Sequence, residues 1–400
     1  MTDAPGGVWE QVVGQPAAVA TLTAAAAAAA DQLAGRPAAP GAMTHAWLFT
    51  GPPGSGRSVA ARAFAAALQC PNGGCGTCQE CHTVLAGTHA DVRAVVPQGL
   101  SIPVGEMRAL VLRAASSPSR GRWQVIVIED ADRLTEQAAN ALLKAVEEPA
   151  DRSVWLLCTP SDHPDDVPVT IRSRCRVVAL RTPDPEAVAD LLTRRDGVDA
   201  ATARWAASAS QGHVGRARRL ATDAEARDRR TAVLDLPRTL TGLGACYDAA
   251  EKLVAAVEGE AVALTEHRDE EETAALKQAL GAGGTGKGAA AATRGTAGVI
   301  KELERRQKSR ATRTQRDALD RALTDLAAFY RDVLVTRLGA RVPLVHPDIA
   351  DVSARAARAW TPESTLRRLE AVLACRDAID ANVKPRIAVE AMAITLWQGH

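Results

Sequence analysis

A glycine-rich loop near the N-terminus constrains the fold of this 400-residue chain more than any other feature. Residues 51–58 read Gly-Pro-Pro-Gly-Ser-Gly-Arg-Ser and follow the G-x4-G-K-[ST] spacing of a phosphate-binding P-loop at every position but one. The apolar run 45–50 before the loop predicts a buried strand, and the alanine-rich run 59–65 after it predicts a helix. A strand, a glycine-rich loop and a helix in this order indicate an α/β fold of the P-loop type with a parallel sheet.

The exception in the loop is Arg57, which stands where P-loop ATPases carry lysine. In such loops glycines let backbone N–H groups surround phosphate oxygens, and a Ser or Thr hydroxyl holds Mg²⁺. The chain keeps these other nucleotide-binding positions as Gly51, Gly54, Ser55, Gly56 and Ser58. A guanidinium is a broad planar group rather than a compact point charge, and the first lysine of the chain is Lys144. We therefore expect a degenerate nucleotide site with little or no ATP turnover.

Four of the eight cysteines form the second strong pattern. They are spaced as C-x4-C-x2-C-x2-C, at Cys70, Cys75, Cys78 and Cys81. Thiolates at this spacing can converge on one tetrahedral cation, and the glycines and the proline between them allow tight turns. Disulfides between such close neighbours are disfavoured in a reducing cytosol. We predict a closed structural Zn²⁺ site. A reactive thiol cluster is the alternative, and His82 or His89 is close enough in sequence to replace a ligand.

Two carboxylates after a second apolar run resemble a Walker B segment. Residues 123–128 predict a buried strand, and Glu129 and Asp130 follow it directly. ATPases of this type usually place Asp first, to hold Mg²⁺, and Glu second. The order is exchanged here, so one side chain is longer and the other shorter than the chemistry requires. This exchange predicts a second defect in the same site.

Further strands are predicted at 154–158 and 176–180, and a helix is predicted at 136–148. Ligands of open parallel sheets gather at the carboxyl ends of the strands. Thr159 follows one of these strands and is a candidate polar sensor of nucleotide. Ser161 is an equal alternative, because Pro160 and the loop after it leave the alignment open.

Composition limits the function classes without selecting one. The chain carries 48 basic and 47 acidic residues, so its net charge of +1 creates no global field that favours nucleic acid or membrane. It has no apolar run of 18 or more uncharged residues and no signal-peptide pattern, so we expect a cytoplasmic protein without a membrane segment. Its length predicts two or three domains.

The ordered set of motifs resembles the bacterial clamp-loader branch of the AAA+ proteins, and within it the delta-prime subunits of DNA polymerase III. The set comprises Val12-Val13-Gly14-Gln15, the P-loop, the four-cysteine insert, the carboxylates at 129–132 and Ser173-Arg174-Cys175. The resemblance resumes at 211–217, similar to sensor 2, and at 382–390, similar to the last collar helix. It covers most of the chain apart from about 266–298, and it implies an AAA+ core with a small helical lid and an α-helical C-terminal collar.

The resemblance also implies roles for two arginines. In this family the arginine of the Ser-Arg-Cys triplet is a finger that reaches the γ-phosphate of the Mg²⁺-bound ATP held by a neighbouring subunit, and Arg174 is the matching residue here. A surface arginine that caps a strand is the alternative. Arg216 matches the sensor 2 position, although Arg218 and Arg219 beside it make a solvated basic helix face nearly as plausible.

A second glycine-rich stretch does not qualify as a P-loop. Residues 281–287 match the G-x4-G-K spacing, but Gly288 takes the Ser/Thr position and no apolar strand precedes them. We interpret about 281–298 as a flexible glycine-alanine linker. The helix predicted after it, at about 299–337, is basic from Lys301 to Arg316, and its interspersed acidic residues favour a solvated collar helix over DNA binding.

We therefore expect an AAA+ core at 1–182 with the zinc insert at 70–81, a helical lid at 183–232 and a helical collar or oligomerisation domain at 233–400. The resemblance implies a non-motor delta-prime subunit that binds nucleotide weakly or not at all. Its implied partners are the gamma/tau and delta subunits of a hetero-pentamer, the sliding clamp, and primed DNA reached through the complex. One alternative is an active gamma/tau-like ATPase motor, which Arg57 opposes. The other is a zinc-dependent nucleic-acid-binding module with a vestigial nucleotide fold, and the lack of a basic-aromatic patch around the cysteines opposes it.

Overall fold

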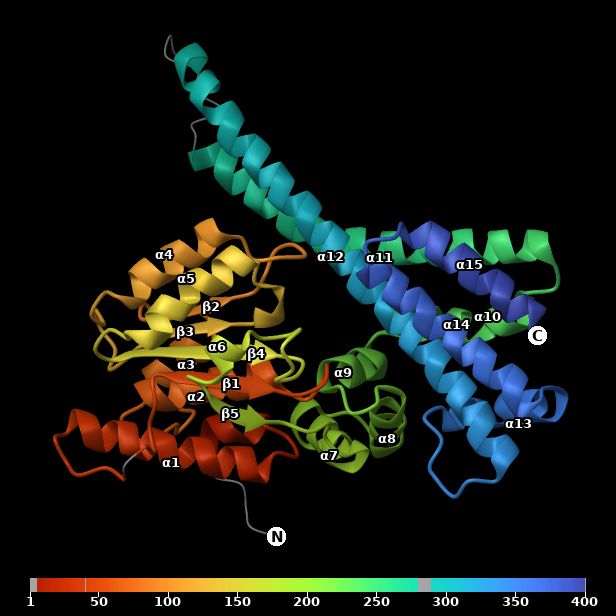
Figure 1. Ribbon diagram of the computed structural model, residues 1–400, viewed down its shortest axis with the longest axis horizontal. Coiled ribbons are helices and arrows are strands. Elements are labelled where there is room, and N and C mark those ends of the chain that lie inside the picture. The colour runs from red at the N-terminus through yellow and green to blue at the C-terminus, as the bar shows by residue number, and fades with distance from the viewer. Residues whose placement is uncertain (1–5, 40, 280–288, 400) are drawn as a thin grey trace. The chain divides into compact units, whose positions relative to one another are not determined.

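The computed structural model describes residues 6–39, 41–279 and 289–399. By its contacts the chain divides into two compact units, Met1–Ala221 and Thr222–His400 (Figure 1). Among the described residues, no helix has both the length and the apolar character needed to cross a membrane.

The first unit is built on a five-stranded parallel sheet. Its strands are β1 (Ala46–Thr50), β2 (Val92–Val95), β3 (Gln124–Ile128), β4 (Ser153–Thr159) and β5 (Arg176–Ala179). They lie in the order β2-β3-β4-β1-β5, and every neighbouring pair is parallel. All residues of β1, β3 and β4 are buried, as expected for parallel strands that are covered on both faces.

Helices cover both faces of this sheet, as Figure 1 shows. Because side chains alternate along a strand, Trp47 and Phe49 of β1 join one hydrophobic cluster, whereas Leu48 joins the other. The first cluster includes η1 (Gly7–Gln11), α1 (Pro16–Leu33), α2 (Arg57–Gln69) and α3 (Gln79–Leu85). The second includes α4 (Val104–Ala114), η2 (Ala131–Arg133), α5 (Glu136–Glu147) and α6 (Val169–Arg172). The unit continues with α7 (Pro185–Asp196), α8 (Ala200–Ala209) and α9 (Val214–Thr222).

This arrangement confirms the predicted AAA+ fold class. The P-loop follows β1, the carboxylates follow β3, and Thr159 ends β4, which lies between the other two strands. All three functional segments therefore meet at the carboxyl edge of adjacent strands. β1 lies between β4 and β5, so the order of strands along the chain changes direction at β1. Open parallel sheets form a ligand crevice at such a point, outside the carboxyl ends of the strands.

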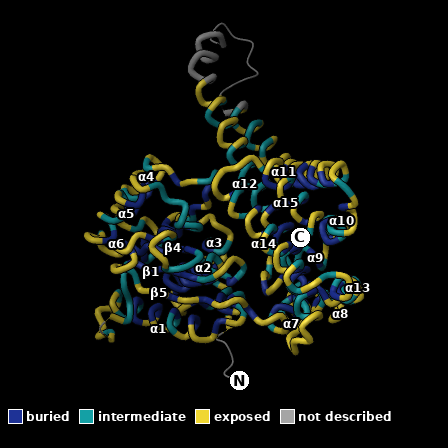
Figure 2. The backbone as a smooth tube through the Cα atoms, turned by 45° about the vertical axis from the view of Figure 1, so that its right-hand side comes forward, coloured by how far each residue is buried: buried dark blue, intermediate teal, exposed yellow. Residues whose placement is uncertain are grey.

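The second unit is helical, which confirms the prediction of a helical C-terminal region. Its elements are α10 (Ala224–Thr239), α11 (Leu243–Ala279), α12 (Ala289–Leu338), η3 (Pro347–Ile349), α13 (Ala350–Ala359), α14 (Pro362–Asp380) and α15 (Pro385–Gln398). α12 packs on α11, α13 and α14, and α11 also packs on α15. The inward faces of these helices form one hydrophobic core around Leu323, Leu326 and Tyr330. Figure 2 shows dark blue, buried stretches along the helices of this unit.

The segment between α11 and α12 differs from the expected linker. The glycine-rich stretch 281–287 lies outside the described residues, so the linker prediction is not tested there. Residues 289–298, expected to continue the linker, instead form the start of α12. Alanine is the strongest helix former, and this stretch is rich in alanine, so its composition favours a helix over a flexible linker.

Candidate nucleotide-binding site and metal centre

The P-loop lies between the end of β1 and the start of α2, and two of its glycines are required by close contacts. A Cβ at Gly51 would lie 2.5 Å from the carbonyl oxygen of Leu180. At Gly54 the backbone has a φ of 88°, and a Cβ would lie 2.8 Å from the Cβ of His213. Since His213 belongs to the segment that resembles sensor 2, this contact brings that segment directly against the P-loop.

Gln15, at the end of the Val-Val-Gly-Gln motif, joins the P-loop to the segment after β5. Its amide nitrogen donates to the carbonyl oxygen of Ser55 at 3.3 Å and to that of Arg181 at 2.5 Å. Its amide oxygen accepts from the backbone N–H of Arg181 at 3.2 Å. The side chain is buried, so these bonds are shielded from water. The sequence motif pointed to Gln15, but these partners come from the structure.

The two Walker B carboxylates each face an arginine of α2. Arg62 Nη2 makes an ion pair with Glu129 Oε1. Arg57 Nη2 lies 4.0 Å from Asp130 Oδ1, and the side chain of Arg57 is only 12% exposed. Arg57 Nη1 is buried and has no hydrogen-bond partner in the described part of the chain. Asp130 has a φ of 52°, a strained backbone for a residue with a side chain.

Arg62 was not identified from the sequence. It lies beyond the P-loop motif, 67 residues from Glu129, and no spacing rule connects the two. Nearby, burial raises the pKa of Asp132, and the negative charge of Asp130 adds to this effect. The site thus holds arginines where an ATPase holds lysine and metal, and its residues do not fit a catalytic Mg²⁺–ATP complex.

The hydroxyl groups of the two candidate sensors are engaged within their own loop. Thr159 is fully buried, and its Oγ1 donates to the carbonyl oxygen of Ser161 at 2.7 Å. Ser161 Oγ donates to Asp166 Oδ2 at 2.5 Å. The loop also touches the P-loop, because Gly51 N–H donates to the carbonyl oxygen of Pro160 at 3.1 Å. The assignment of Thr159 as a sensor remains a prediction.

The other two predicted arginines occupy different environments. Arg216 lies in the first turn of α9, half-buried, and its backbone N–H donates to His213 Nδ1 at 3.2 Å. Arg174 follows α6 and is 38% exposed. Its Nη2 pairs with Glu147 Oε1 at 2.7 Å, and its Nη1 donates to the carbonyl oxygen of Thr170 at 2.8 Å. These contacts fix the Arg174 guanidinium at the surface.

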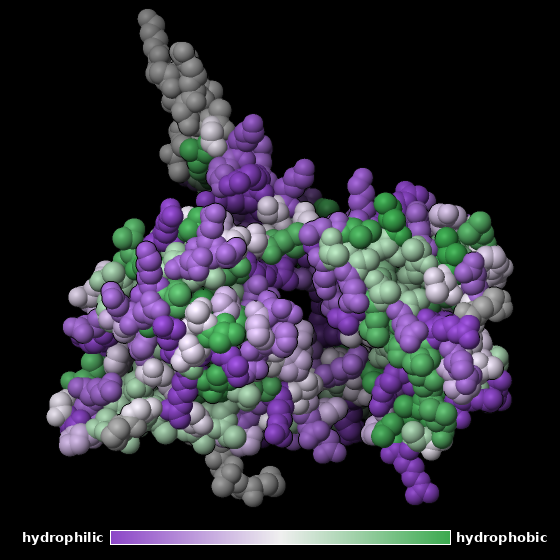
Figure 3. Space-filling model, viewed as in Figure 1, coloured by the Kyte–Doolittle hydropathy of each residue, from purple (hydrophilic) through white to green (hydrophobic). Residues whose placement is uncertain are grey.

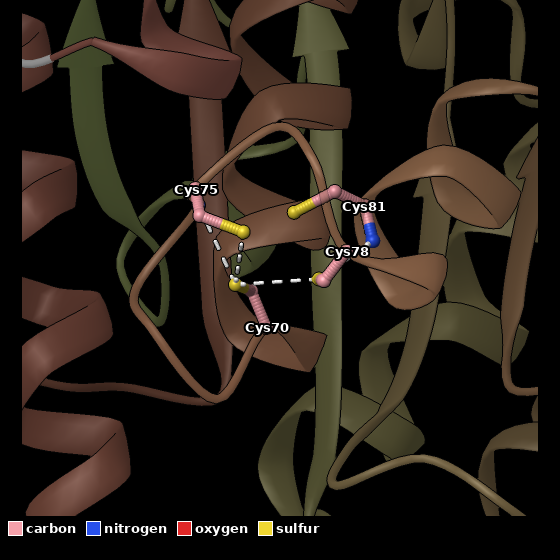
Figure 4. Close-up of side chains that lie close together, drawn as sticks. All are labelled: Cys70, Cys75, Cys78 and Cys81. Atoms are coloured by element: carbon pink, nitrogen blue, oxygen red, sulfur yellow. Dashed lines mark hydrogen bonds between the residues drawn. The ribbon is translucent and has the colours of Figure 1, made fainter.

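The four predicted metal ligands converge at the end of α2. All four sulfur atoms lie within 4.8 Å of one another, and Figure 4 shows them turned toward a common centre. Cys70 Sγ is 3.6 Å from Cys75 Sγ and 3.7 Å from Cys78 Sγ. A tetrahedral zinc with Zn–S bonds of about 2.3 Å needs sulfur separations of about 3.8 Å. The donor set therefore fits a four-coordinate metal such as zinc.

Backbone N–H groups support this cluster. Asn72 and Cys75 donate to Cys70 Sγ, and Gly76 donates to Cys81 Sγ, at distances of 3.3–3.4 Å. Hydrogen bonds from Thr77 lower the pKa of Cys75 to about 6, whereas burial raises the pKa of Cys81. His82 is exposed, and His89 pairs with Glu80 at 2.7 Å, so neither histidine belongs to the four-sulfur group.

The cysteine loop is fixed to its surroundings on two sides. On one side, the N–H of Val8 in η1 donates to the carbonyl oxygen of Gly74 at 3.0 Å, and the neighbouring Trp9 is buried. On the other, Arg122 Nη1 donates to the carbonyl oxygen of Cys70 at 3.0 Å. None of these contacts was predicted from the sequence, because they join segments that lie far apart along the chain.

Comparisons with known proteins agree with this geometry. Residues 28–184 match the family described as DNA polymerase III, delta subunit. The chain is 34% identical over 157 residues to the DNA polymerase III subunit delta' of Bacillus subtilis, an alignment that covers 38% of this chain and 47% of that protein. It is 36% identical over 156 residues to the delta' subunit of Pseudomonas aeruginosa, with the same coverage. Residues 28–184 are therefore similar to a region of DNA polymerase III clamp-loader subunits, with named relatives of the delta' type.

The alignments extend over about half the length of these curated relatives, and the family match ends at residue 184, before the second unit begins. The gamma/tau subunit of Mycobacterium tuberculosis is similarly related, at 33% identity over 157 residues, 38% of this chain and 27% of that protein.

Similar solved structures have low overall superposition scores. The Thermotoga maritima RuvB Holliday junction branch migration motor is 19% identical, with a TM-score of 0.38 over 57% of this chain and 67% of that one. The Bacillus subtilis clamp loader delta protein is 10% identical, with a TM-score of 0.28 over 93% of this chain and 99% of that one. The fold assignment therefore rests on the strand order and on the P-loop after β1.

Proposed function

We propose that this protein is the non-motor, delta-prime subunit of a DNA polymerase III clamp loader. It would assemble with gamma/tau and delta subunits into a hetero-pentamer in the cytoplasm and help to load the sliding clamp onto primed DNA. The observation that carries the proposal is the similarity of 156–157 residues to delta' subunits, together with the family match of residues 28–184. The paired arginines at the nucleotide site agree with a subunit that does not hydrolyse ATP.

Within this proposal, Arg174 acts in trans. Its side chain is 38% exposed, so a neighbouring chain can reach it if the ion pair with Glu147 opens. An arginine finger stabilises the charge that develops on a transferred phosphoryl group. ATP and Mg²⁺ would be held by the adjacent motor subunit, and Arg174 would complete that site.

We further propose that Cys70, Cys75, Cys78 and Cys81 hold a structural zinc. All four positions of a tetrahedral ion would be filled by sulfur, which leaves no open site for a substrate. The metal would fix the turn after α2 and, through Gly74 and Cys70, the contacts to η1 and to Arg122, which lies just before β3.

The lid at 183–232 and the collar at 233–400 remain proposals. The exposed apolar side chains of α14 and α15 support a collar that associates with other subunits, since Leu366, Leu373, Ile387 and Trp397 are each at least 40% exposed. Figure 3 shows hydrophobic residues gathered over these helices on the face in view.

A gamma/tau-like motor is the second candidate, because the gamma/tau relatives are about as similar as the delta-prime relatives. The two functions differ in one measurement. A motor would hydrolyse ATP as the purified single chain, whereas we expect no hydrolysis above background, since the lysine is missing and both carboxylates face arginines.

Assembly provides the direct test of the proposed function. The chain should be co-expressed with the gamma/tau and delta subunits of its own organism, and the native mass of the purified complex should be measured. We expect a stable hetero-oligomer that contains this chain. Ile387→Asp should weaken it, whereas Leu264→Asp, an equally exposed change on α11, should not. A chain that never co-purifies with these subunits would contradict the proposal.

A further inference from the structure

The nucleotide site of this chain contains its own cations. Arg57 and Arg62 both belong to α2, and both extend to carboxylates that follow β3. Arg62 pairs with Glu129, whose side chain is only 13% exposed, and Arg57 lies near Asp130. Each carboxylate of the Walker B segment therefore already has a positively charged partner from the same chain.

These pairs oppose the entry of a metal. In P-loop ATPases Mg²⁺ is held by the Ser/Thr of the loop and by the Walker B carboxylate. Here a divalent cation would have to displace a guanidinium and then remain beside two arginines. Arginine cannot lose its proton at any ordinary pH, so the repulsion cannot be relieved by titration. The partly buried surroundings strengthen it, because charges interact more strongly away from water.

We infer that Arg62 is a second closing residue of this site, and that Arg57 and Arg62 together act as internal counterions that exclude Mg²⁺–nucleotide. This inference deepens the proposed function, because it gives a physical reason why the subunit would not be a motor. It rests on the proposed function only for that interpretation. Its new content is Arg62, which lies outside the P-loop motif. Restoring the consensus lysine alone should therefore not restore metal-dependent binding.

The test is a set of variants of the full-length chain: wild type, Arg57→Lys, Arg62→Gln and the double variant Arg57→Lys/Arg62→Gln. Affinity for a fluorescent ATP analogue is measured in Mg²⁺ and in EDTA. We expect the same affinity in both conditions for the wild type and for each single variant. In the double variant, Mg²⁺ should raise the affinity at least tenfold, because Glu129 no longer pairs with Arg62 and the guanidinium beside Asp130 has been replaced by the lysine of the consensus loop.

A matched control uses Arg57→Lys/Arg36→Gln. Arg36 also pairs with an aspartate, Asp31, but at the exposed end of α1, so this variant should behave like Arg57→Lys alone. Folding of every variant is verified by its circular dichroism and melting temperature. A Mg²⁺–ATP-dependent rise in melting temperature of the double variant alone would give the same answer as the binding assay.

Three results would overturn the inference: a full gain from Arg57→Lys alone, Mg²⁺-dependent binding by the wild type, or a folded double variant with no gain. None of these depends on the clamp-loader complex. Failure of the inference would thus leave the assembly result untouched, and failure to assemble would leave this result untouched.

Discussion

Asp91, immediately before β2, fixes the loop that leads into β3, and its replacement by asparagine is our most quantitative prediction. Its Oδ1 accepts from the N–H and the hydroxyl of Ser119, both at 2.7 Å. Its Oδ2 accepts from the N–H groups of Arg120, at 2.8 Å, and of Gly121. Burial alone would raise the pKa of Asp91, but these hydrogen bonds to the charged form outweigh it and lower the pKa to about 2.

The size of the effect follows from this shift. A pKa that falls from 3.8 in the unfolded chain to about 2 in the folded one corresponds to about 2.5 kcal/mol of stability at neutral pH. Because the folded pKa is the lower one, this stabilisation is complete above about pH 4 and is lost as the pH falls toward 2. The change Asp91→Asn would turn an amide NH₂ toward backbone donors, so it should cost at least this amount.

The assay is urea unfolding of the first unit, followed by tryptophan fluorescence at pH 7 and at pH 5. Asp91→Asn should lower the free energy of unfolding by at least about 2.5 kcal/mol, and by the same amount at both pH values, since both lie above 3.8. The control is Asp165→Asn, whose side chain is almost fully exposed and should change little. A variant as stable as this control, or a loss that disappears by pH 5, would refute the reasoning.

Two further predictions concern the metal and the second unit. Purified chain should contain about one zinc by elemental analysis, and Cys75→Ser should lose it, whereas Cys175→Ser outside the cluster should keep it; metal-free protein made under reducing conditions would exclude the site. In the second unit, burial and the positive charge of Arg230 lower the pKa of the fully buried His346. The stability contributed by neutral His346 is therefore complete above about pH 6.5 and is lost as the pH falls below 6.5. When the pH is lowered from 7.5 to 5.5, the free energy of unfolding measured in urea should fall less for the His346→Asn variant than for the wild type or for the exposed control His267→Asn. Equal decreases in all three proteins would contradict this prediction.

Much of the fold is encoded locally and could be predicted. The apolar runs 123–128 and 154–158 are long enough, and bounded clearly enough, to identify β3 and β4 within one residue. The four cysteines carry their chemistry in their spacing, and the P-loop carries its conformation in its glycines. β2 is a short strand, Val-Arg-Ala-Val, with one exposed arginine, so its pattern is too weak to predict a strand.

The contacts that define the site could not be predicted, because they depend on how distant segments meet. Arg62 looks like an ordinary helix residue until the sheet places Glu129 beside it. Asp91 looks like a loop aspartate until residues 119–121 fold over it. Likewise, Gln307 and Arg310 of α12 meet Asp269 of α11 across a gap of about 40 residues in the sequence. No local pattern encodes such pairs.

We propose that this chain does not hydrolyse ATP itself but completes the site of a neighbour. We therefore regard Arg174→Ala in the reconstituted clamp loader as the most direct test of this proposal. The control is Arg172→Ala, a similarly exposed arginine two residues away that pairs with Asp162. Both complexes should assemble with their zinc, since neither side chain contributes to the core.

The quantity to measure is ATP hydrolysis by the assembled complex in the presence of the sliding clamp and primed DNA. Loss of an arginine finger lowers the rate at the site it completes by roughly 10³-fold or more. With Arg174→Ala we expect total hydrolysis to fall by the share of that one site and clamp loading to slow, while Arg172→Ala retains the wild-type rate. An Arg174→Ala complex that hydrolyses ATP and loads clamps at the unmodified rate would contradict the account.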